Sequence, residues 1–237
     1  PMPQGLGTLP FGDEDALREA FAHGDVLAVA FETVQGEGGI RPQPRSYLAL
    51  ARELCDRHGA LLIADEVQCG NGRTGTYFAI QSHGVRPDVI ATAKGLGGGF
   101  PVGAVLMAQH AADVLTPGDH GTTYGGGPLA CAAAEAAVSA ILEQDLAGRA
   151  RELGAWFMDH LRERIGGSPL VKEIRGVGLM IGIELTVPGR PLVEGMLERG
   201  ILGNVTMDTV LRLVPPLVVE RPELEWFTEQ LHELLAH

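Results

Sequence analysis

The segment RSYLALARELCDRHGALLIADEV (residues 45–67) decides the fold. Residues 45–59 follow a proline, carry apolar side chains at helical spacing and end at a glycine, so they predict an amphipathic helix. Residues 60–67 are continuously apolar before they turn acidic, which predicts a buried strand. A strand that is apolar on both faces is typical of a mostly parallel sheet covered by helices, and this predicts an α/β protein.

The alternation of helices and strands continues on both sides of this segment. The expected elements are a helix at residues 13–24 and strands at residues 26–31, 88–94 and 102–108. In sheets of this kind, ligands bind at the carboxyl ends of the strands. Asp65 and Lys94 both stand at such ends.

From Pro128 onward the pattern changes to long helices and paired strands. The sequence predicts helices at residues 128–145, 146–165, 191–200 and 222–236, a strand–turn–strand unit at 171–185 and a further strand at 209–217. We therefore expect two domains: the C-terminal part of a large domain over residues 1–145, and a small α+β domain over residues 146–237.

Composition restricts the possible partners and location. The 237 residues carry 30 acids and 18 bases, a net charge of −12, which argues against binding to nucleic acid or an anionic membrane. Three cysteines without CxxC spacing and scattered histidines indicate neither a disulfide framework nor a metal site. With no signal peptide and no membrane helix in the sequence, we expect a cytoplasmic protein.

Lys94 lies in the segment ATAKGLGGGFPVGAV (residues 91–105) and is one of two lysines in the chain. With histidine counted as neutral, it is the only charged residue from Val89 to Ala112. An amine in apolar surroundings gives up its proton more readily and becomes a nucleophile that forms Schiff bases with aldehydes, pyridoxal phosphate included. The alternative is an ordinary surface lysine at the end of a strand.

Asp65 ends the predicted strand at residues 60–67, where a buried carboxylate needs a cation or a strong donor. The protonated ring nitrogen of pyridoxal phosphate is such a partner. The alternative is an aspartate that braces a loop or caps a helix. The glycines at residues 95–99 do not follow the order of a nucleotide-binding loop and predict a close turn around a flat ligand.

Four further strings occur in one order along the chain together with the lysine segment. They are FETVQGEGGI (31–40), DEVQCGNGRTG (65–75), HGTTYGGGPLA (120–130) and LRLVPPL (211–217). The chain resembles the class III aminotransferases, and most closely the acetylornithine aminotransferases. The resemblance implies the type I fold of pyridoxal phosphate enzymes, like that of aspartate aminotransferase. It also implies a homodimer that moves an amino group from N-acetylornithine, or a related ω-amine, to 2-oxoglutarate in arginine or lysine biosynthesis.

The resemblance also implies roles for individual residues. Lys94 matches the lysine that carries pyridoxal phosphate and moves the substrate proton. Asp65 matches the partner of the ring nitrogen, while Val67 packs on the ring and Gln68 hydrogen-bonds the ring hydroxyl. Thr123 matches the residue that reaches the phosphate of the cofactor in the neighbouring subunit.

Two more residues are implied to handle the substrates. Arg212 matches the arginine that holds the carboxylate of glutamate or 2-oxoglutarate, for which a planar bidentate donor is well suited. Glu37 matches a glutamate that neutralises this arginine while the amine donor is bound and swings away for 2-oxoglutarate. Glu32 is expected to stand behind this pair. The alternative is a surface ion pair of little energetic consequence.

The chain departs from the family pattern in two ways. Gly127 stands where the family usually has asparagine, and the chain matches only the C-terminal part of the family's length. The family's N-terminal phosphate-binding loop is therefore expected to be missing from this sequence. Two alternatives stay open: a non-catalytic fragment or pseudoenzyme that serves as an assembly module, and a different pyridoxal phosphate reaction such as that of a mutase or decarboxylase. The amine donor stays open as well.

Overall fold

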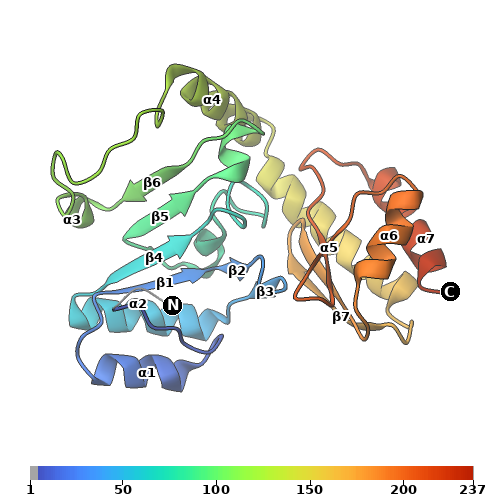
Figure 1. The fold of residues 1–237 in the computed structure, drawn as a ribbon, viewed down its shortest axis with the longest axis horizontal. Coiled ribbons are helices and arrows are strands. Elements are labelled where there is room, and N and C mark those ends of the chain that lie inside the picture. Colours follow the sequence, from blue (N-terminus) through green and yellow to red (C-terminus); the bar gives the residue numbers. More distant parts are fainter. Residues whose placement is uncertain (1–4, 237) are drawn as a thin grey trace.

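A computed structural model describes residues 5–236 and shows two lobes, each built around its own sheet (Figure 1). The sheet of the N-terminal lobe has the order β1-β4-β5-β6, with β1 at Ala28–Glu32, β4 at Leu61–Asp65, β5 at Val89–Thr92 and β6 at Ala104–Met107. The first three strands are parallel, and β6 is antiparallel to β5. The expected α/β fold with a mostly parallel sheet is confirmed.

Helices cover one face of this sheet (Figure 1). Helix α1 (Glu14–Ala22) begins where the Asp13 carboxylate accepts the amide N–H of Ala16 at 2.9 Å, and α2 (Arg45–His58) ends at Gly59 in the left-handed region. Their apolar faces and the sheet form a buried core. The shorter elements of this lobe are β2 (Val34–Gln35), β3 (Arg41–Pro42), the 3-10 helices η1 (Ala79–His83) and η2 (Lys94–Gly97), and α3 (Gln109–Ala112).

Two long helices lead from one lobe to the other. Helix α4 (Pro128–Glu143) begins with its proline in the first turn, where the missing N–H costs no hydrogen bond. Helix α5 (Leu146–Ile165) follows directly, with the Asp145 carboxylate accepting the N–H of Gly148 at 3.1 Å. Figure 1 shows α4 beside the β6 edge of the N-terminal sheet and α5 reaching into the C-terminal lobe.

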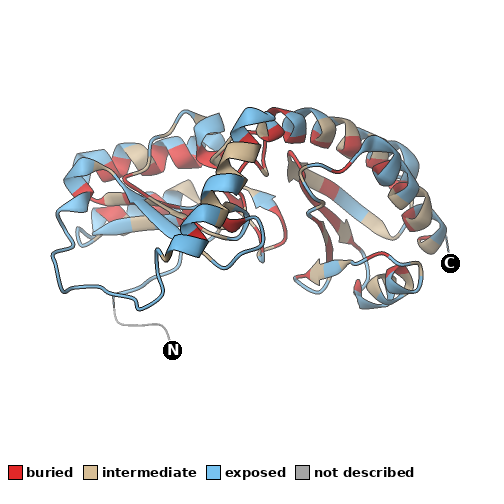
Figure 2. Cartoon of the chain, turned by 90° about the horizontal axis from the view of Figure 1, so that it is seen from above, coloured by how far each residue is buried: buried red, intermediate tan, exposed pale blue. Residues whose placement is uncertain are grey.

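The C-terminal lobe has an antiparallel sheet of order β7-β8-β10-β9, with β7 at Val171–Val177, β8 at Met180–Leu185, β9 at Asn204–Thr206 and β10 at Val210–Leu213. Helices α5, α6 (Arg190–Glu198) and α7 (Arg221–Leu234) pack against it around a core that includes Phe157, Ile183 and Leu211. Figure 2 shows buried residues along the strands of this sheet and on the side of α5 that faces them.

Several elements differ from those that the sequence predicts. Strands β1, β5 and β6 are shorter than expected, and β2, β3 and β9 were not expected at all. These three strands have two or three residues each, and each is defined by pairing with the neighbouring strand of its hairpin rather than by its own apolar pattern. Among residues 5–236, the structure has no helix with both the length and the apolar composition of a membrane span.

Hydrogen bonds to main-chain carbonyls join the two lobes. The amide of Leu179, in the turn between β7 and β8, donates to the carbonyl of Arg73 at 3.0 Å. The Arg73 guanidinium donates in return to the carbonyls of Leu179, at 3.2 Å, and Pro215. A Cβ at Gly178 would lie 2.7 Å from the Arg73 carbonyl oxygen, so only glycine allows this approach.

Candidate active site

The carboxyl ends of three neighbouring strands carry the first group of candidate residues. Glu32 on β1 is in register with Asp65 on β4, and Asp65 is in register with Ala91 on β5. Strand β5 ends at Thr92, so Lys94 follows at the same edge of the sheet. The parallel pairing therefore brings Asp65 and Lys94 to one side of the lobe, although the sequence separates them.

A strained turn presents Lys94. Its φ of 46° lies in the left-handed region, which costs a non-glycine residue about 1 kcal/mol. The buried amide of Asn71 holds this turn, donating to the Thr92 hydroxyl at 3.0 Å and to the Ala93 carbonyl at 3.1 Å. The sequence reading missed Asn71. Its place in CGNGRTG beside other matched residues was the available signal, but the bonds to residues 92 and 93 follow from the fold.

The structure corrects the expected setting of these two residues. Lys94 and Asp65 are exposed, where the sequence predicted apolar surroundings and a buried carboxylate. The reason is that Asp65 is the last residue of β4 and Lys94 follows the end of β5, at an edge of the sheet that the surrounding helices leave open. Within residues 5–236, the Lys94 ammonium has no hydrogen bond or ion pair, and the Asp65 carboxylate accepts one hydrogen bond, from the Val67 amide at 3.0 Å. Both side chains keep polar atoms available for a ligand.

A second group joins the two lobes. The Arg212 guanidinium on β10 donates to the Glu37 carboxylate at 2.5 Å and to the Gln68 side-chain oxygen at 3.2 Å. The Gln68 amide nitrogen donates to the same Glu37 oxygen at 3.0 Å. The structure thus brings the two implied substrate-handling residues into contact, and Gln68 bridges them. The hydrogen bonds from Arg212 and Gln68 hold the pKa of Glu37 below its usual value.

Arg212 retains a free donor beside this contact. Its side chain is 15% exposed, and its Nε atom is buried without a hydrogen-bond partner among residues 5–236. A buried donor without a partner costs free energy, so this N–H favours a ligand that can accept it. A carboxylate can accept two parallel N–H bonds from a guanidinium, and Arg212 has one N–H without a partner.

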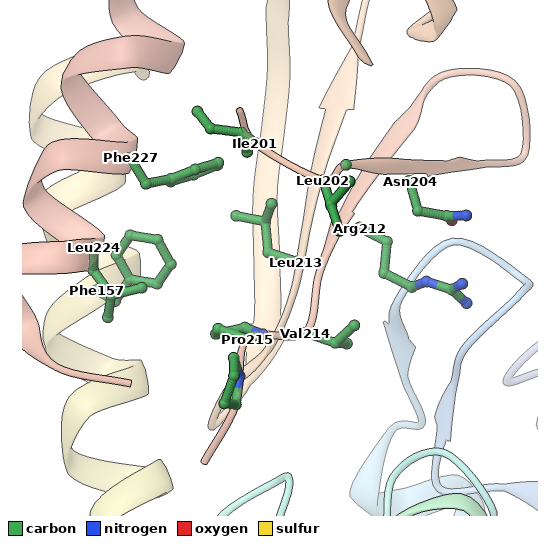
Figure 3. Close-up of a pocket in the computed structure, with 12 residues that line it drawn as sticks. Phe157, Ile201, Leu202, Asn204, Arg212, Leu213, Val214, Pro215, Leu224 and Phe227 are labelled. Carbon is green, nitrogen blue, oxygen red and sulfur yellow. The ribbon is translucent and has the colours of Figure 1, made fainter. Parts of the chain in front are cut away.

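An apolar cavity of about 400 Å³ adjoins the strand that carries Arg212 (Figure 3). Phe157, Leu224 and Phe227 lie on one side of this cavity, and Arg212 and Asn204 point to the other side (Figure 3). The guanidinium consequently points toward the ribbon of the N-terminal lobe and away from the aromatic rings.

Glu32 supports the loop that carries Glu37. Its carboxylate accepts the Gly36 amide at 2.8 Å. Partial burial raises the pKa of Glu32, the Gly36 hydrogen bond opposes this, and the neighbouring Asp65 carboxylate adds to the increase. Glu32 therefore fixes the start of this loop and interacts electrostatically with the Asp65 carboxylate.

The donor set fits pyridoxal phosphate, the cofactor that the sequence implies. An exposed primary amine at Lys94 suits the aldehyde, and an available carboxylate oxygen at Asp65 suits the ring nitrogen. A cavity of about 560 Å³, lined in part by Val67, Gln68 and Lys94, adjoins the amine and lies within the usual size of a small-molecule site.

Thr123 lies apart from this group. It is exposed in the segment between α3 and α4, and it does not line the cavities that include Lys94. Its neighbour Tyr124 is 90% exposed. Gly127 directly precedes α4 in extended backbone with a φ of −61°, so the residue in this position needs no glycine-specific conformation.

Known proteins are similar to this chain over nearly its whole length. A sequence profile of the aminotransferase class-III family matches residues 14–235. The chain is 47% identical over 236 residues to the acetylornithine aminotransferase of Methanocaldococcus jannaschii, covering 100% of this chain and 59% of that protein. It is 46% identical over 235 residues to ornithine aminotransferase 2 of Staphylococcus aureus, covering 99% of this chain and 59% of that protein.

A solved structure is similar over the whole chain. The ornithine aminotransferase of Toxoplasma gondii, described with partial occupancy of pyridoxal phosphate at its active site, superposes with a TM-score of 0.94 at 38% identity. The match covers 100% of this chain and 57% of the other. The chain thus spans somewhat less than two thirds of the length of the relatives that it matches.

Proposed function

The chain belongs to the class III aminotransferases, and from this premise we propose that it transfers an amino group from N-acetylornithine or a related ω-amine to 2-oxoglutarate. Pyridoxal phosphate is the cofactor of this family. The observation that supports the proposal is the arrangement of three residues. Lys94 and Asp65 lie at one edge of the sheet, and Arg212, whose Nε has no hydrogen-bond partner among residues 5–236, contacts Gln68 beside the cavity that Lys94 lines. The acetylornithine and ornithine aminotransferases among its relatives support this class of donor.

Each cofactor-binding residue has a defined task in this proposal. When bound, the cofactor would supply an electron sink that makes the C–H next to the reacting amino group acidic. Lys94 would hold the cofactor through its side-chain amine and, once released, would move the proton to and from the reacting carbon as a general base and acid. The Asp65 carboxylate keeps the ring nitrogen protonated, Val67 packs against the ring, and Gln68 hydrogen-bonds the ring hydroxyl.

Glu37 and Arg212 sort the two substrates. While the ω-amine donor reacts, Glu37 neutralises Arg212 in the contact observed here. When the dicarboxylate arrives, its distal carboxylate takes the guanidinium, Glu37 moves away, and the free Nε provides the second bond of a bidentate pair. Two chemically different substrates require such an exchange, whereas a mutase or decarboxylase does not.

The proposal also covers the oligomeric state of the protein, its division into domains and its location in the cell. We propose a homodimer in which Thr123 reaches the cofactor phosphate of the neighbouring subunit, supported by the exposure of Thr123, Tyr124 and the apolar residues of β6. We also propose domains at residues 1–145 and 146–237, a division that falls between α4 and α5. A cytoplasmic role in arginine or lysine biosynthesis goes with these substrates.

The test of the proposed function is the loss of cofactor attachment in Lys94→Ala. We expect the wild-type protein to gain a visible absorption band with pyridoxal phosphate, and borohydride to remove the band and fix the cofactor on the peptide that contains Lys94. Lys172→Ala changes the only other lysine and is the matched control, expected to behave as wild type.

Peptide mass spectrometry and the absorption band together decide the outcome. Attachment to Lys172, or equal bands in wild type and Lys94→Ala, would refute the cofactor assignment. Single half-reactions with N-acetylornithine, ornithine and 4-aminobutyrate then identify the donor. If the cofactor is attached and no donor reacts, the assembly-module alternative gains support.

A further inference from the structure

Two arginines and a glycine form one row across the C-terminal sheet. Arg175 on β7 is in register with Gly182 on β8, and Gly182 is in register with Arg212 on β10. Residues opposite each other on neighbouring strands point to the same face of a sheet. Both guanidinium groups therefore stand on one face, and Gly182 itself places no side chain between them.

The loop that carries Glu37 lies over this row. Residues 36–40 connect the paired strands β2 and β3. The completely buried Ile40 covers Gly182 so closely that a Cβ there would lie 2.9 Å from the Ile40 Cβ. The Ile40 φ of 53° is unusual for a β-branched residue and persists only where the surroundings hold it.

Arg175 supplies this hold. Its Nε donates to the carbonyls of Gly39 at 3.1 Å and Ile40 at 3.0 Å, and its NH2 group donates to the Gly39 carbonyl at 2.7 Å. Both accepting carbonyls belong to the N-terminal lobe, while Arg175 belongs to the C-terminal lobe. Arg175 thus binds the loop across the lobes. Among residues 5–236, the two accepting carbonyls have no other hydrogen bond.

The other edge of Arg175 is fixed within its own sheet. Its NH1 group donates to the carboxylates of Glu173 and Glu184, and the side chain is 15% exposed. Lys172 on the same strand also donates to Glu184 but does not contact the loop. Charge-assisted bonds on both edges leave the planar guanidinium little freedom to rotate.

Together these contacts hold the loop at Glu37 and at the residues that follow it. The Thr206 hydroxyl on β9 donates to the Glu37 carbonyl, and Arg212 binds the Glu37 carboxylate. Arg175 binds the carbonyls two and three residues further along. Movement of the Glu37 side chain away from Arg212 can therefore proceed while the backbone of the loop stays in place.

We infer that Arg175 is a positioning residue that holds the loop 36–40 so that Glu37 returns to Arg212, and thereby sets the preference between ω-amine and dicarboxylate substrates. This inference rests on the proposed function of Glu37 and Arg212. Arg175 itself acts only through the loop. If the Arg175 guanidinium no longer binds the two loop carbonyls, Glu37 neutralises Arg212 less often. The ω-amine donor then binds beside an unpaired Arg212 guanidinium.

The test uses Arg175→Lys, which keeps the charge for Glu184 but cannot reach both carbonyls and the carboxylates as a fork does. Lys172→Gln is the matched control, because it changes the same ion cluster without touching the loop. We measure hydrogen exchange of the peptide covering residues 36–43, and kcat/KM for each half-reaction, with N-acetylornithine and with glutamate as donors.

We expect faster exchange in residues 36–43 for Arg175→Lys only. We also expect the ratio of kcat/KM for N-acetylornithine to that for glutamate to fall about tenfold, a change of the size that one charge-assisted hydrogen bond produces. A merely structural role would lower both half-reactions equally and leave the ratio unchanged. Gly182→Ala, which displaces Ile40 by contact, is expected to give the same two changes.

Hydrogen exchange of residues 36–43 tests whether Arg175 holds the loop. The ratio of kcat/KM values tests whether Arg175 sets the substrate preference. Unchanged exchange in Arg175→Lys and in Gly182→Ala overturns the hold on the loop, whatever the activity. Faster exchange with an unchanged substrate ratio overturns the control of preference. If exchange is faster and the wild type transfers no amino group from any donor, the proposed function fails and the hold on the loop stands.

Discussion

Glu66 is completely buried, immediately after the exposed Asp65. Its carboxylate accepts the amide N–H groups of Ala79 at 2.8 Å and Ile80 at 2.9 Å, and the Thr33 hydroxyl at 3.1 Å. Burial raises the pKa of Glu66, and the hydrogen bonds from Ile80 and Ala79 reduce the increase without cancelling it. This residue links the turn after β4 to η1, and so holds the strand end that carries Asp65.

The raised pKa of Glu66 predicts a pH effect on stability. Because the folded pKa is above the unfolded one, the folded protein takes up the proton first as pH falls. Stability is therefore lost as pH rises from the usual glutamate value through the folded pKa. We expect Glu66→Gln to lack this loss, so that its free energy of unfolding relative to wild type increases between about pH 4 and pH 8.

Urea titrations across this range measure the difference between variant and wild type, in which the titrations of other groups cancel. Glu53→Gln changes an exposed glutamate in the same way and is the control. A Glu66→Gln difference that does not vary with pH would contradict the assignment of a raised pKa.

At the scale of elements, α5 packs directly on the turn between β7 and β8. Gly154 lies in the buried face of this helix, and a Cβ there would lie 2.0 Å from the carbonyl oxygen of Gly178. The obstacle is main chain that itself contacts Arg73, so it cannot move aside cheaply. The closeness of helix and turn thus depends on a residue without a side chain.

Gly154→Ala is expected to lower the free energy of unfolding by about 2 kcal/mol or more, the cost of forcing an extra carbon into a packed interior. The better helix propensity of alanine, about 1 kcal/mol, offsets only part of it. Denaturant unfolding measures the change. Gly167→Ala, where a Cβ meets no atom within 4 Å, is the control and is expected to be nearly neutral. Equal stability of the two variants would contradict the close contact.

At the scale of the whole molecule, the lobes are joined by reciprocal arginine–carbonyl contacts. Arg73 of the N-terminal lobe donates to the carbonyls of Leu179 and Pro215, and Arg175 of the C-terminal lobe donates to those of Gly39 and Ile40. Burial lowers the pKa of Arg73 to about 10. These contacts set the distance between Lys94, on one lobe, and Arg212, on the other.

Arg73→Gln is expected to weaken the coupling between the lobes. The shorter side chain leaves buried carbonyls without a donor, which costs about 2 kcal/mol. We expect calorimetry to show a broader transition, or two, where the wild type shows one. Arg164→Gln removes an exposed ion pair with Glu229 and is expected to leave the transition unchanged. A single transition of unchanged width in Arg73→Gln would contradict this coupling.

The sequence by itself determined the class of fold, the family and most long elements. Residues 45–67 predict α2 and β4, and the predicted helix at residues 146–165 coincides with α5. These predictions succeed because a helix or strand with a buried face has a regular spacing of apolar residues, which is visible in the local sequence. The sequence also singled out Lys94, as a rare lysine beside glycines, and Asp65, at the end of a buried strand. These are local features, and no contact is needed to see them.

Only the tertiary structure decided the exposure of Lys94 and Asp65, the bridge that Gln68 makes between Glu37 and Arg212, and the hold of Arg175 on the loop. Arg175 and Gly39 are separated by 136 positions, and Arg212 and Glu37 by 175. Such contacts depend on strand register and on the approach of two lobes, which local periodicity does not encode. The short strand β9 escaped prediction for another reason, because its three residues show no apolar period and its pairing with β10 defines it.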